Sequence, residues 1–185
     1  MKSLCTSLLF CLVSGSAYAA QQTVHRSETN GLYTWTSIAE GFSIELIQVV
    51  PDFIRAIYSK HDFPREEIEE IAGYCVYGSI IRNTSDKTLR YSVSDWRVVH
   101  DGTEHTIKTK TQWLAQWRKA GVVFSWTLLP DEGTFYEGAW QQGFTTVKLP
   151  RDSEFDLVYR WSLDGVEYTD RIEDVVCSPE EVTLP

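Results

Sequence analysis

The stretch 155–176, FDLVYRWSLDGVEYTDRIEDVV, contains the clearest fold signal in the chain. Two runs rich in β-branched and aromatic residues flank Asp164-Gly165, a dipeptide that readily adopts the positive φ angles of a two-residue turn. The pattern predicts two antiparallel strands, 155–163 and 166–176, joined by a tight hairpin.

A second dipeptide of this kind, Asp101-Gly102, predicts a hairpin between strands at 89–100 and 103–109. Further β-rich runs predict strands at 32–37, 42–48, 74–82, 122–128 and 145–149. Short helices are expected from Pro51, after Pro64 and over 111–120. The hairpins require antiparallel pairing, and the strands do not alternate regularly with helices. The sequence therefore predicts a mainly β protein, an antiparallel β-sandwich with two or three short helices.

One segment carries a resemblance to a known class of domain. Residues 78–89, GSIIRNTSDKTL, form an expected strand that runs into an Asn-Thr-Ser turn and then a short apolar restart. This pattern resembles that of exported bacterial immunoglobulin-like domains. The resemblance implies an immunoglobulin-like sandwich and no particular activity.

The N-terminus has the features of a secretory signal peptide. An apolar run at 4–13 is followed by Ala17-Tyr18-Ala19, which places small residues at the positions that signal peptidase reads. We therefore expect a signal peptide over 1–19, a flexible polar arm over 20–30, one domain over 31–178 and a tail over 179–185. The expected location is the bacterial periplasm or the medium.

Composition excludes two classes of partner. The 185 residues carry a net charge of −9, whereas phosphate recognition needs clustered Lys and Arg. No apolar run of about 20 residues follows the signal, so no transmembrane segment is expected after cleavage.

The cysteine count points to a disulfide. Cys5 and Cys11 lie in the expected signal peptide, which leaves Cys75 and Cys177. Two cysteines in an exported chain most often form one bridge. The alternative is a pair of thiolate metal ligands or redox cysteines, although the sequence contains no C-x-x-C.

Two histidines are candidate metal ligands. With Asp101-Gly102 as the turn, His100 faces Thr103 and Val98 faces His105, so the imidazoles lie diagonally on one sheet face. Such a pair could hold a copper or zinc ion. Glu104 points to the other face, so a third ligand is missing locally. The alternative is an ordinary polar hairpin tip.

The stretch 130–143, PDEGTFYEGAWQQG, is long for a connection between strands. It carries Phe135, Tyr136 and Trp140, and Phe144 follows. One interpretation is an aromatic surface that binds a sugar, a peptide or a partner protein. The alternative is a loop that covers an open end of the sandwich.

The other large aromatic residues are expected in the core. Trp113 and Trp117 have the spacing of one buried helix face. Four further tryptophans lie on expected strands, namely Trp35, Trp96, Trp126 and Trp161.

Catalytic signals are weak. No G-x-S-x-G elbow occurs, and four acids are candidates only through nearby aromatics: Asp95, Asp131, Glu137 and Asp156. The leading hypothesis is an exported, non-enzymatic binding or accessory protein that contacts a protein or small-molecule ligand through the 130–144 stretch and the Asp101-Gly102 hairpin. One alternative is a periplasmic copper- or zinc-binding protein that uses the His pair. The other is a carbohydrate-binding or carbohydrate-active protein that uses the aromatic stretch.

Overall fold

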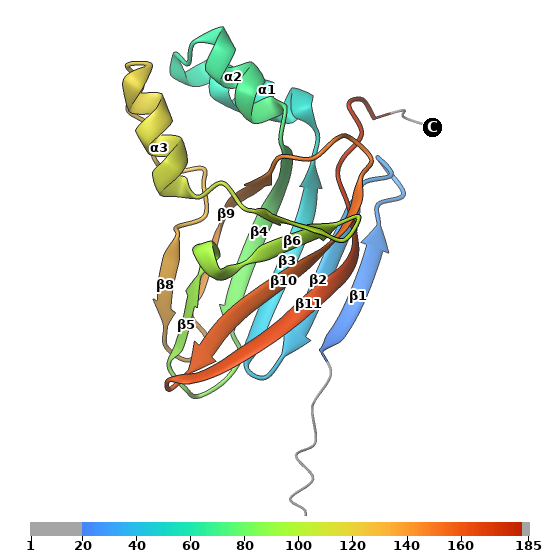
Figure 1. Cartoon of the computed structure of the whole chain (residues 1–185), viewed down its shortest axis with the longest axis vertical. Helices are drawn as coiled ribbons and strands as arrows, with labels where there is room; N and C mark the ends of the chain where they lie inside the picture. Colours follow the sequence, from blue (N-terminus) through green and yellow to red (C-terminus); the bar gives the residue numbers. More distant parts are fainter. Residues whose placement is uncertain (1–19, 183–185) are drawn as a thin grey trace, which may run out of the picture.

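The computed structural model describes residues 20–182, which form two antiparallel sheets packed face to face with three short helices at one end (Figure 1). The predicted mainly β sandwich with short helices is thereby confirmed. Segment 78–89 runs from one sheet into the other, from β4 to β5.

The first sheet has the strand order β1-β2-β3-β4-β9. Its strands are β1 (Gln21–Arg26), β2 (Tyr33–Ala39), β3 (Phe42–Val49), β4 (Cys75–Asn83) and β9 (Trp140–Val147). The second sheet has the order β7-β6-β10-β5-β8, and β11 pairs with the other edge of β10. Its strands are β5 (Leu89–Ser92), β6 (Arg97–His100), β7 (Thr103–Thr106), β8 (Glu132–Phe135), β10 (Glu154–Leu163) and β11 (Val166–Val176).

Both predicted hairpins are confirmed. Asp101 and Gly102 have φ angles of 48° and 72°, and Asp164 and Gly165 have 49° and 85°. Positive φ at both central residues matches the right-handed twist of the flanking strands. The register pairs Val98 with His105, as the turn position requires.

The main core lies between the sheets and follows the alternation of the strands. In β3, Phe42, Ile44 and Leu46 are buried, since every second side chain of a strand points to the same face. Phe42 stacks on Tyr159 and Trp161 of β10, with ring centroids 5.3 and 5.0 Å apart. Aromatic contacts therefore join the inner faces of the two sheets.

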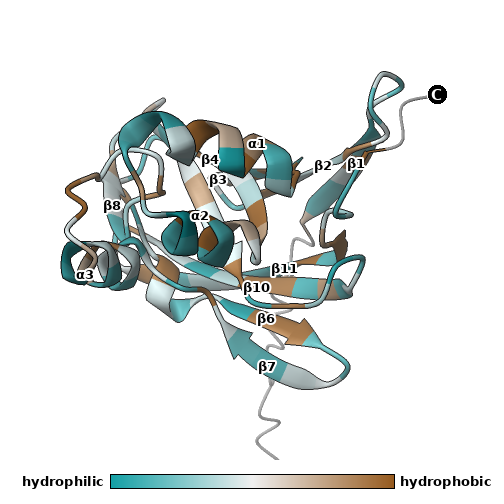
Figure 2. Cartoon of the chain, turned by 90° about the horizontal axis from the view of Figure 1, so that it is seen from above, coloured by the Kyte–Doolittle hydropathy of each residue, from teal (hydrophilic) through white to brown (hydrophobic). Residues whose placement is uncertain are grey.

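A second apolar cluster lies beneath the helices α1 (Pro51–Tyr58), α2 (Arg65–Ala72) and α3 (Lys110–Lys119). The three helices gather at one end of the sandwich (Figure 2). Pro51 occupies the first turn of α1, where its missing N–H costs no hydrogen bond. Trp113 and Trp117 are fully buried on one face of α3, which confirms that expectation.

The prediction of a flexible arm over residues 20–30 is wrong for most of that range, because Gln21–Arg26 forms β1. This strand pairs with β2 along all six residues. The side-chain amide of Gln22 also donates to Glu173 O and accepts from Glu173 N, both at 2.9 Å. Because β1 is a polar edge strand that is exposed on both faces, its sequence shows no alternation of apolar and polar residues. The strand could therefore not be predicted from that pattern.

Other expected elements also differ. Segment 122–128 is not a strand and makes only one isolated bridge, between Leu128 and Phe144. The expected strand at 89–100 is divided by a 3₁₀ turn at Val93–Asp95. The expected loop at 130–143 contains β8 and the start of β9, which belong to different sheets.

The disulfide between Cys75 and Cys177 is confirmed, with a Cα–Cα distance of 5.1 Å. It joins the start of β4 to the residue after β11. Beyond it, Glu180 binds Arg55 of α1 at 3.0 Å and Arg151 at 3.2 Å, which ties the chain to the helical end.

The predicted signal peptide lies outside the described residues. Within residues 20–182, no helix has the length and apolarity needed to cross a membrane.

Candidate functional site

The four aromatic residues predicted as a binding surface separate in the structure. Phe135 is 7% exposed and packs in the main core against Tyr91, with ring centroids 5.6 Å apart. Phe144 is half-buried against the helical cluster. Tyr136 and Trp140 are 73% and 53% exposed. The surface is therefore smaller than predicted, and Phe135 belongs to the core.

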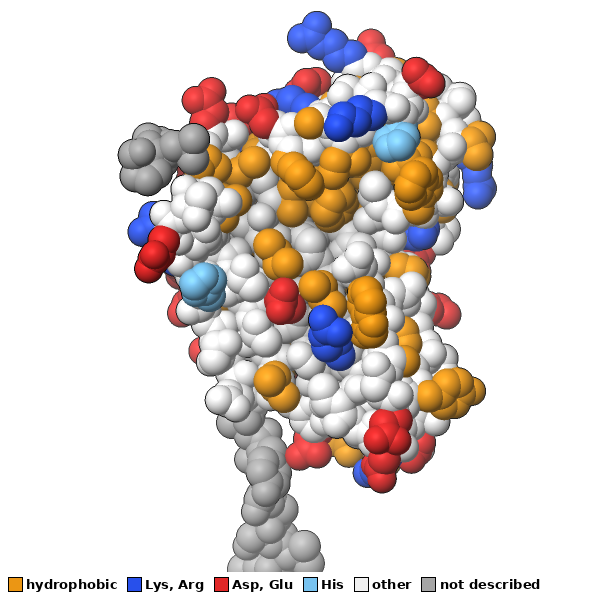
Figure 3. Space-filling view, turned by 180° about the vertical axis from the view of Figure 1, so that it is seen from behind, with side chains coloured by type: hydrophobic (Ala, Val, Ile, Leu, Met, Phe, Trp, Pro, Cys, Tyr) orange, Lys and Arg blue, Asp and Glu red, His pale blue; other side chains and the backbone are white. Residues whose placement is uncertain are grey.

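A groove of about 300 Å³ lies on the outer face of the first sheet. Gly78 and Ile80 of β4 line it at the centre, between Ile47 of β3 and Phe144 of β9. It is lined by Ile47, Gly78, Ser79, Ile80, Trp126, Thr127, Gln142, Gly143 and Phe144. Figure 3 shows this face, where hydrophobic side chains gather and single charged side chains lie among them.

Trp126 forms one wall of the groove and is 74% exposed, which corrects its expected place in the core. The ring lies against His61 and Phe124, with centroid distances of 5.5 and 5.4 Å. The next residue, Thr127, shares a hydrogen bond of 2.6 Å with the hydroxyl of Tyr58. Burial raises the pKa of the Tyr58 hydroxyl, because its anion would be poorly solvated there.

The apolar surface continues down the same sheet face. Trp140 lies opposite Arg82 on the neighbouring strand, and the Arg82 guanidinium sits 5.4 Å from its ring centroid. Ile38 on β2 is 48% exposed and Ile47 on β3 is 36% exposed. Sequence reasoning missed Gly78, although a glycine within an apolar strand is a recognised signal for a close approach or a hollow.

The histidine pair lies as predicted, with ring centroids of His100 and His105 6.3 Å apart. Nδ1 of His100 is hydrogen-bonded to the carbonyl oxygen of Glu154 at 2.9 Å, and Nε2 lies 3.4 Å from the carboxylate of Asp101. Within the described part of the chain, no group of three His, Cys, Asp or Glu residues could hold a metal ion. Among residues 20–182 the pair therefore has no third protein ligand of the kind that copper and zinc sites use.

Two of the candidate acids have structural partners. Asp131 accepts the backbone N–H of Thr111 at the start of α3, at 3.0 Å. Asp156 pairs with Arg171 on the neighbouring strand, also at 3.0 Å. Both carboxylates therefore have structural partners within the fold.

No family model matches the sequence, and no curated protein matches it. Among solved structures, the chain is similar to the crystal structure of a "putative lipoprotein" from Bacillus subtilis subsp. subtilis str. 168. The identity is 9%, the TM-score is 0.39, and the match covers 83% of this chain and 39% of that one. The chain spans well under half the length of that protein.

Proposed function

We propose that the protein is an exported, non-enzymatic binding module whose outer β3–β4–β9 face takes the apolar side chains of a protein partner. The observation that carries the proposal is the groove beside Trp126, an exposed indole next to a concave, mostly apolar surface. Exposed apolar surface of this kind is unfavourable in water unless a partner covers it.

Export is supported by the disulfide together with the predicted signal peptide. Bridges such as Cys75–Cys177 form and persist in oxidising compartments and are rare in the cytosol. The periplasm or the medium is therefore the proposed location.

A protein partner suits this face better than a sugar. Of the polar side chains in the groove, the hydroxyl of Thr127 already binds Tyr58, which leaves Gln142 as the main free polar group. A sugar needs several well-placed polar groups. Trp, Tyr and Arg are the residue types enriched in protein interfaces, and Trp126, Trp140 and Arg82 supply them here.

Charges on this face add specificity to the proposed interface. Arg82 and Glu45 are on neighbouring strands of the same face, and neither forms an ion pair within residues 20–182. A partner that presents one charge of each sign around an apolar side chain would complement them. Tyr136 would lie at the rim of this contact, on the turn before β9.

The test combines cross-linking in cells with binding of the purified partner. A photo-cross-linking amino acid replaces Gln142 in the groove or, as a control, Glu104 on β7 of the other sheet. The protein captured only from position 142 is identified and purified. Its affinity is then measured for the wild type, Gly78→Leu, Trp126→Ala and Val166→Ala.

Gly78→Leu fills the groove without removing a contact, since a Cβ at Gly78 would lie 3.7 Å from the nearest atom of Ile47. Gly78→Leu and Trp126→Ala should each weaken binding about tenfold or more. Val166 is 57% exposed on the β10–β11 hairpin, so its replacement should leave binding unchanged. Equal cross-linking from both positions, or unchanged affinity in both groove variants, would overturn the proposal.

A further inference from the structure

Two similar tripeptides pair across the second sheet. Arg90-Tyr91-Ser92 on β5 and Arg160-Trp161-Ser162 on β10 run antiparallel, and the register sets Tyr91 opposite Trp161 and Ser162 opposite Arg90. Tyr91 and Trp161 are 4% and 2% exposed and point into the core. Because side chains alternate along a strand, the arginines and serines lie together on the outer face.

The neighbouring strands extend this pattern with acids. Glu167 on β11 lies opposite Ser162, and Glu132 on β8 lies opposite Ser92. Each serine therefore has a glutamate on one side. Ser162 has Arg90 on its other side, and continuing the same register places Arg160 beside Ser92. One row across the sheet, from β11 to β5, is therefore Glu167–Ser162–Arg90. The next row, from β10 to β8, has the reverse order, Arg160–Ser92–Glu132.

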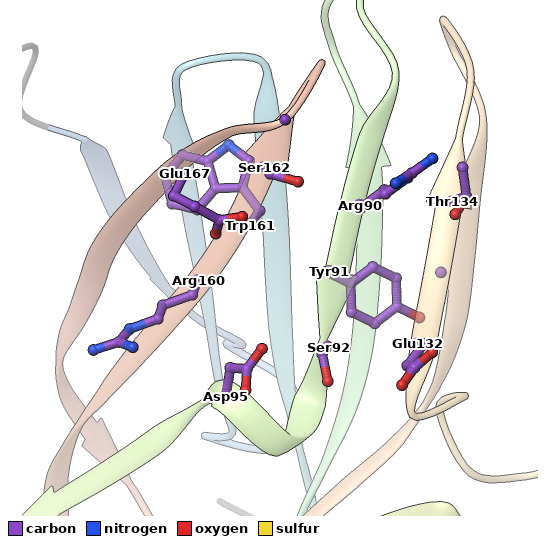
Figure 4. A pocket seen from close by; sticks show the side chains of 12 residues that line it. Arg90, Tyr91, Ser92, Asp95, Glu132, Thr134, Arg160, Trp161, Ser162 and Glu167 are labelled. Atoms are coloured by element: carbon purple, nitrogen blue, oxygen red, sulfur yellow. The ribbon is translucent and has the colours of Figure 1, made fainter.

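A hollow of about 340 Å³ lies over the two serines. Figure 4 shows Arg90 and Arg160 on opposite sides of it, with Ser92 and Ser162 between them, and three acids line the same hollow. The third acid is Asp95, from the 3₁₀ turn that follows β5. Serines are short and their neighbours are long, which is why the sheet surface dips here.

Ser162 is the buried polar group of this hollow. Its residue is 7% exposed and lines the hollow, so what remains accessible of its side chain faces that space. A ligand in the hollow can reach this hydroxyl, which can donate one hydrogen bond and accept others.

The charges around the hollow are also unpaired. Within the described chain, no ion pair involves either arginine or any of the three acids. In each row the strand that carries the serine separates the glutamate from the arginine, so these two residues are two strands apart. Both signs of charge therefore surround a polar floor, and no aromatic face is exposed there on which a sugar could stack.

We propose that this hollow binds a small zwitterion, a free amino acid or short peptide that carries both an ammonium and a carboxylate. The carboxylate binds a guanidinium of Arg90 or Arg160, and the ammonium binds the carboxylates of Glu132, Glu167 or Asp95. The hydroxyl of Ser162 donates to the ligand at the floor. The volume falls within the range of small-molecule sites. This site lies on a different sheet from the apolar groove and does not depend on the function proposed for that groove.

The probe is glycylglycine, which has both charges and no side chain. It is titrated into ¹⁵N-labelled protein, and backbone amide shifts are followed by NMR. Two analogues remove one charge each: N-acetylglycylglycine keeps the carboxylate, and glycylglycine amide keeps the ammonium. The variants are Arg90→Gln, Arg160→Gln and Ser162→Val, with Arg118→Gln on an exposed position of α3 as the matched control.

Glycylglycine should shift the amides of β5, β10 and the adjoining strands and leave those around Gly78 unchanged. Each singly charged analogue, and each variant in the hollow, should bind about tenfold more weakly or worse. Arg118→Gln should bind like the wild type. Saturable shifts elsewhere, no shifts at all, equal binding of the three compounds, or binding that survives both arginine substitutions would overturn the proposal. Ser162→Val is accepted only if its spectrum shows a folded protein, and the arginine variants decide the outcome otherwise.

Discussion

Gly143 lies directly beneath the backbone of Leu129, so that a Cβ at position 143 would overlap the amide nitrogen of Leu129. This approach allows Thr127 O to accept the N–H of Phe144 at 2.7 Å, while Leu129 N donates to Phe144 O at 3.0 Å. The segment that carries Trp126 is held against β9 by these bonds. The shape of the apolar groove therefore depends on the absence of a side chain at Gly143.

Gly143→Ala should destabilise the protein by about 1–3 kcal/mol, the usual result of overpacking, because the obstructing atoms are backbone. Urea unfolding measures this directly. Gly78→Ala is the matched control: its Cβ would meet only ordinary contacts, and it should be neutral or slightly stabilising. Equal losses in the two variants would show that the close approach to Leu129 is not the cause.

The disulfide between Cys75 and Cys177 should contribute up to about 4.7 kcal/mol through the unfolded chain, since it closes a loop of about one hundred residues. The Cys75→Ser/Cys177→Ser variant should unfold at a distinctly lower urea concentration. Thiol titration of mature protein, denatured without reductant, should detect no thiol. Two titratable thiols in that sample would mean that the bridge does not form in the cell.

Alkaline pH should destabilise the fold through Tyr159. Burial raises the pKa of Tyr159 to about 12 from an ordinary value of 10.0, while its hydrogen bond to Ser37, at 2.9 Å, acts in the opposite direction. The unfolded chain therefore loses this proton first, so raising the pH from about 10 to 12 favours unfolding by about 1.4 kcal/mol per pH unit.

Tyr159→Phe separates this effect from the loss of the hydrogen bond. At neutral pH the variant should lose about 1 kcal/mol, because the Ser37 hydroxyl is left buried without its partner. Between pH 10 and 12 its stability should fall less steeply than that of the wild type. Parallel pH curves for the two proteins would contradict the assignment to Tyr159.

The capping box at α3 should be worth about 1 kcal/mol. The side chain of Thr109 accepts from the backbone of Gln112, and the side chain of Gln112 accepts from the backbone N–H of Thr109 at 2.8 Å. Thr109→Ala should therefore lower the unfolding free energy. Thr111→Ala, two residues later on the exposed side of the helix, should not. A loss of equal size at both positions would rule out the cap as its source.

Much of the fold could be predicted from local patterns. Alternation identified β3, proline marked the start of α1, and Asp-Gly placed both hairpins, because each of these signals acts within a few residues. Segment 122–128 is a part of the fold that local patterns predict incorrectly. Val122 and Phe124 are buried while Val123 is 96% exposed, so the side chains alternate as in a strand. The backbone nevertheless lies across the helical cluster without a partner ladder, which no local pattern reveals.

The candidate sites were harder to predict for the same reason. The zwitterion hollow depends on the pairing of Ser162 with Arg90, which are far apart in the sequence. The apolar groove depends on Trp126 lying outside the sheet that it was expected to join. The sequence offered Phe135, Tyr136, Trp140 and Phe144 as one surface, but only Tyr136 and Trp140 are exposed, because Phe135 alternates into the core at the end of β8.

The bridge between Cys75 and Cys177 also limits how the protein can be pulled apart. The two cysteines are 102 residues apart and enclose β4 to β11 together with α3, whereas β1 to β3, α1 and α2 lie outside the closed loop. Tension applied to the two ends of the oxidised chain can extend only the residues outside the bridge. Before a translocating motor or an unfolding protease can thread this protein as a single chain, the disulfide must be reduced. Otherwise the pore must admit more than one segment of the polypeptide at the same time.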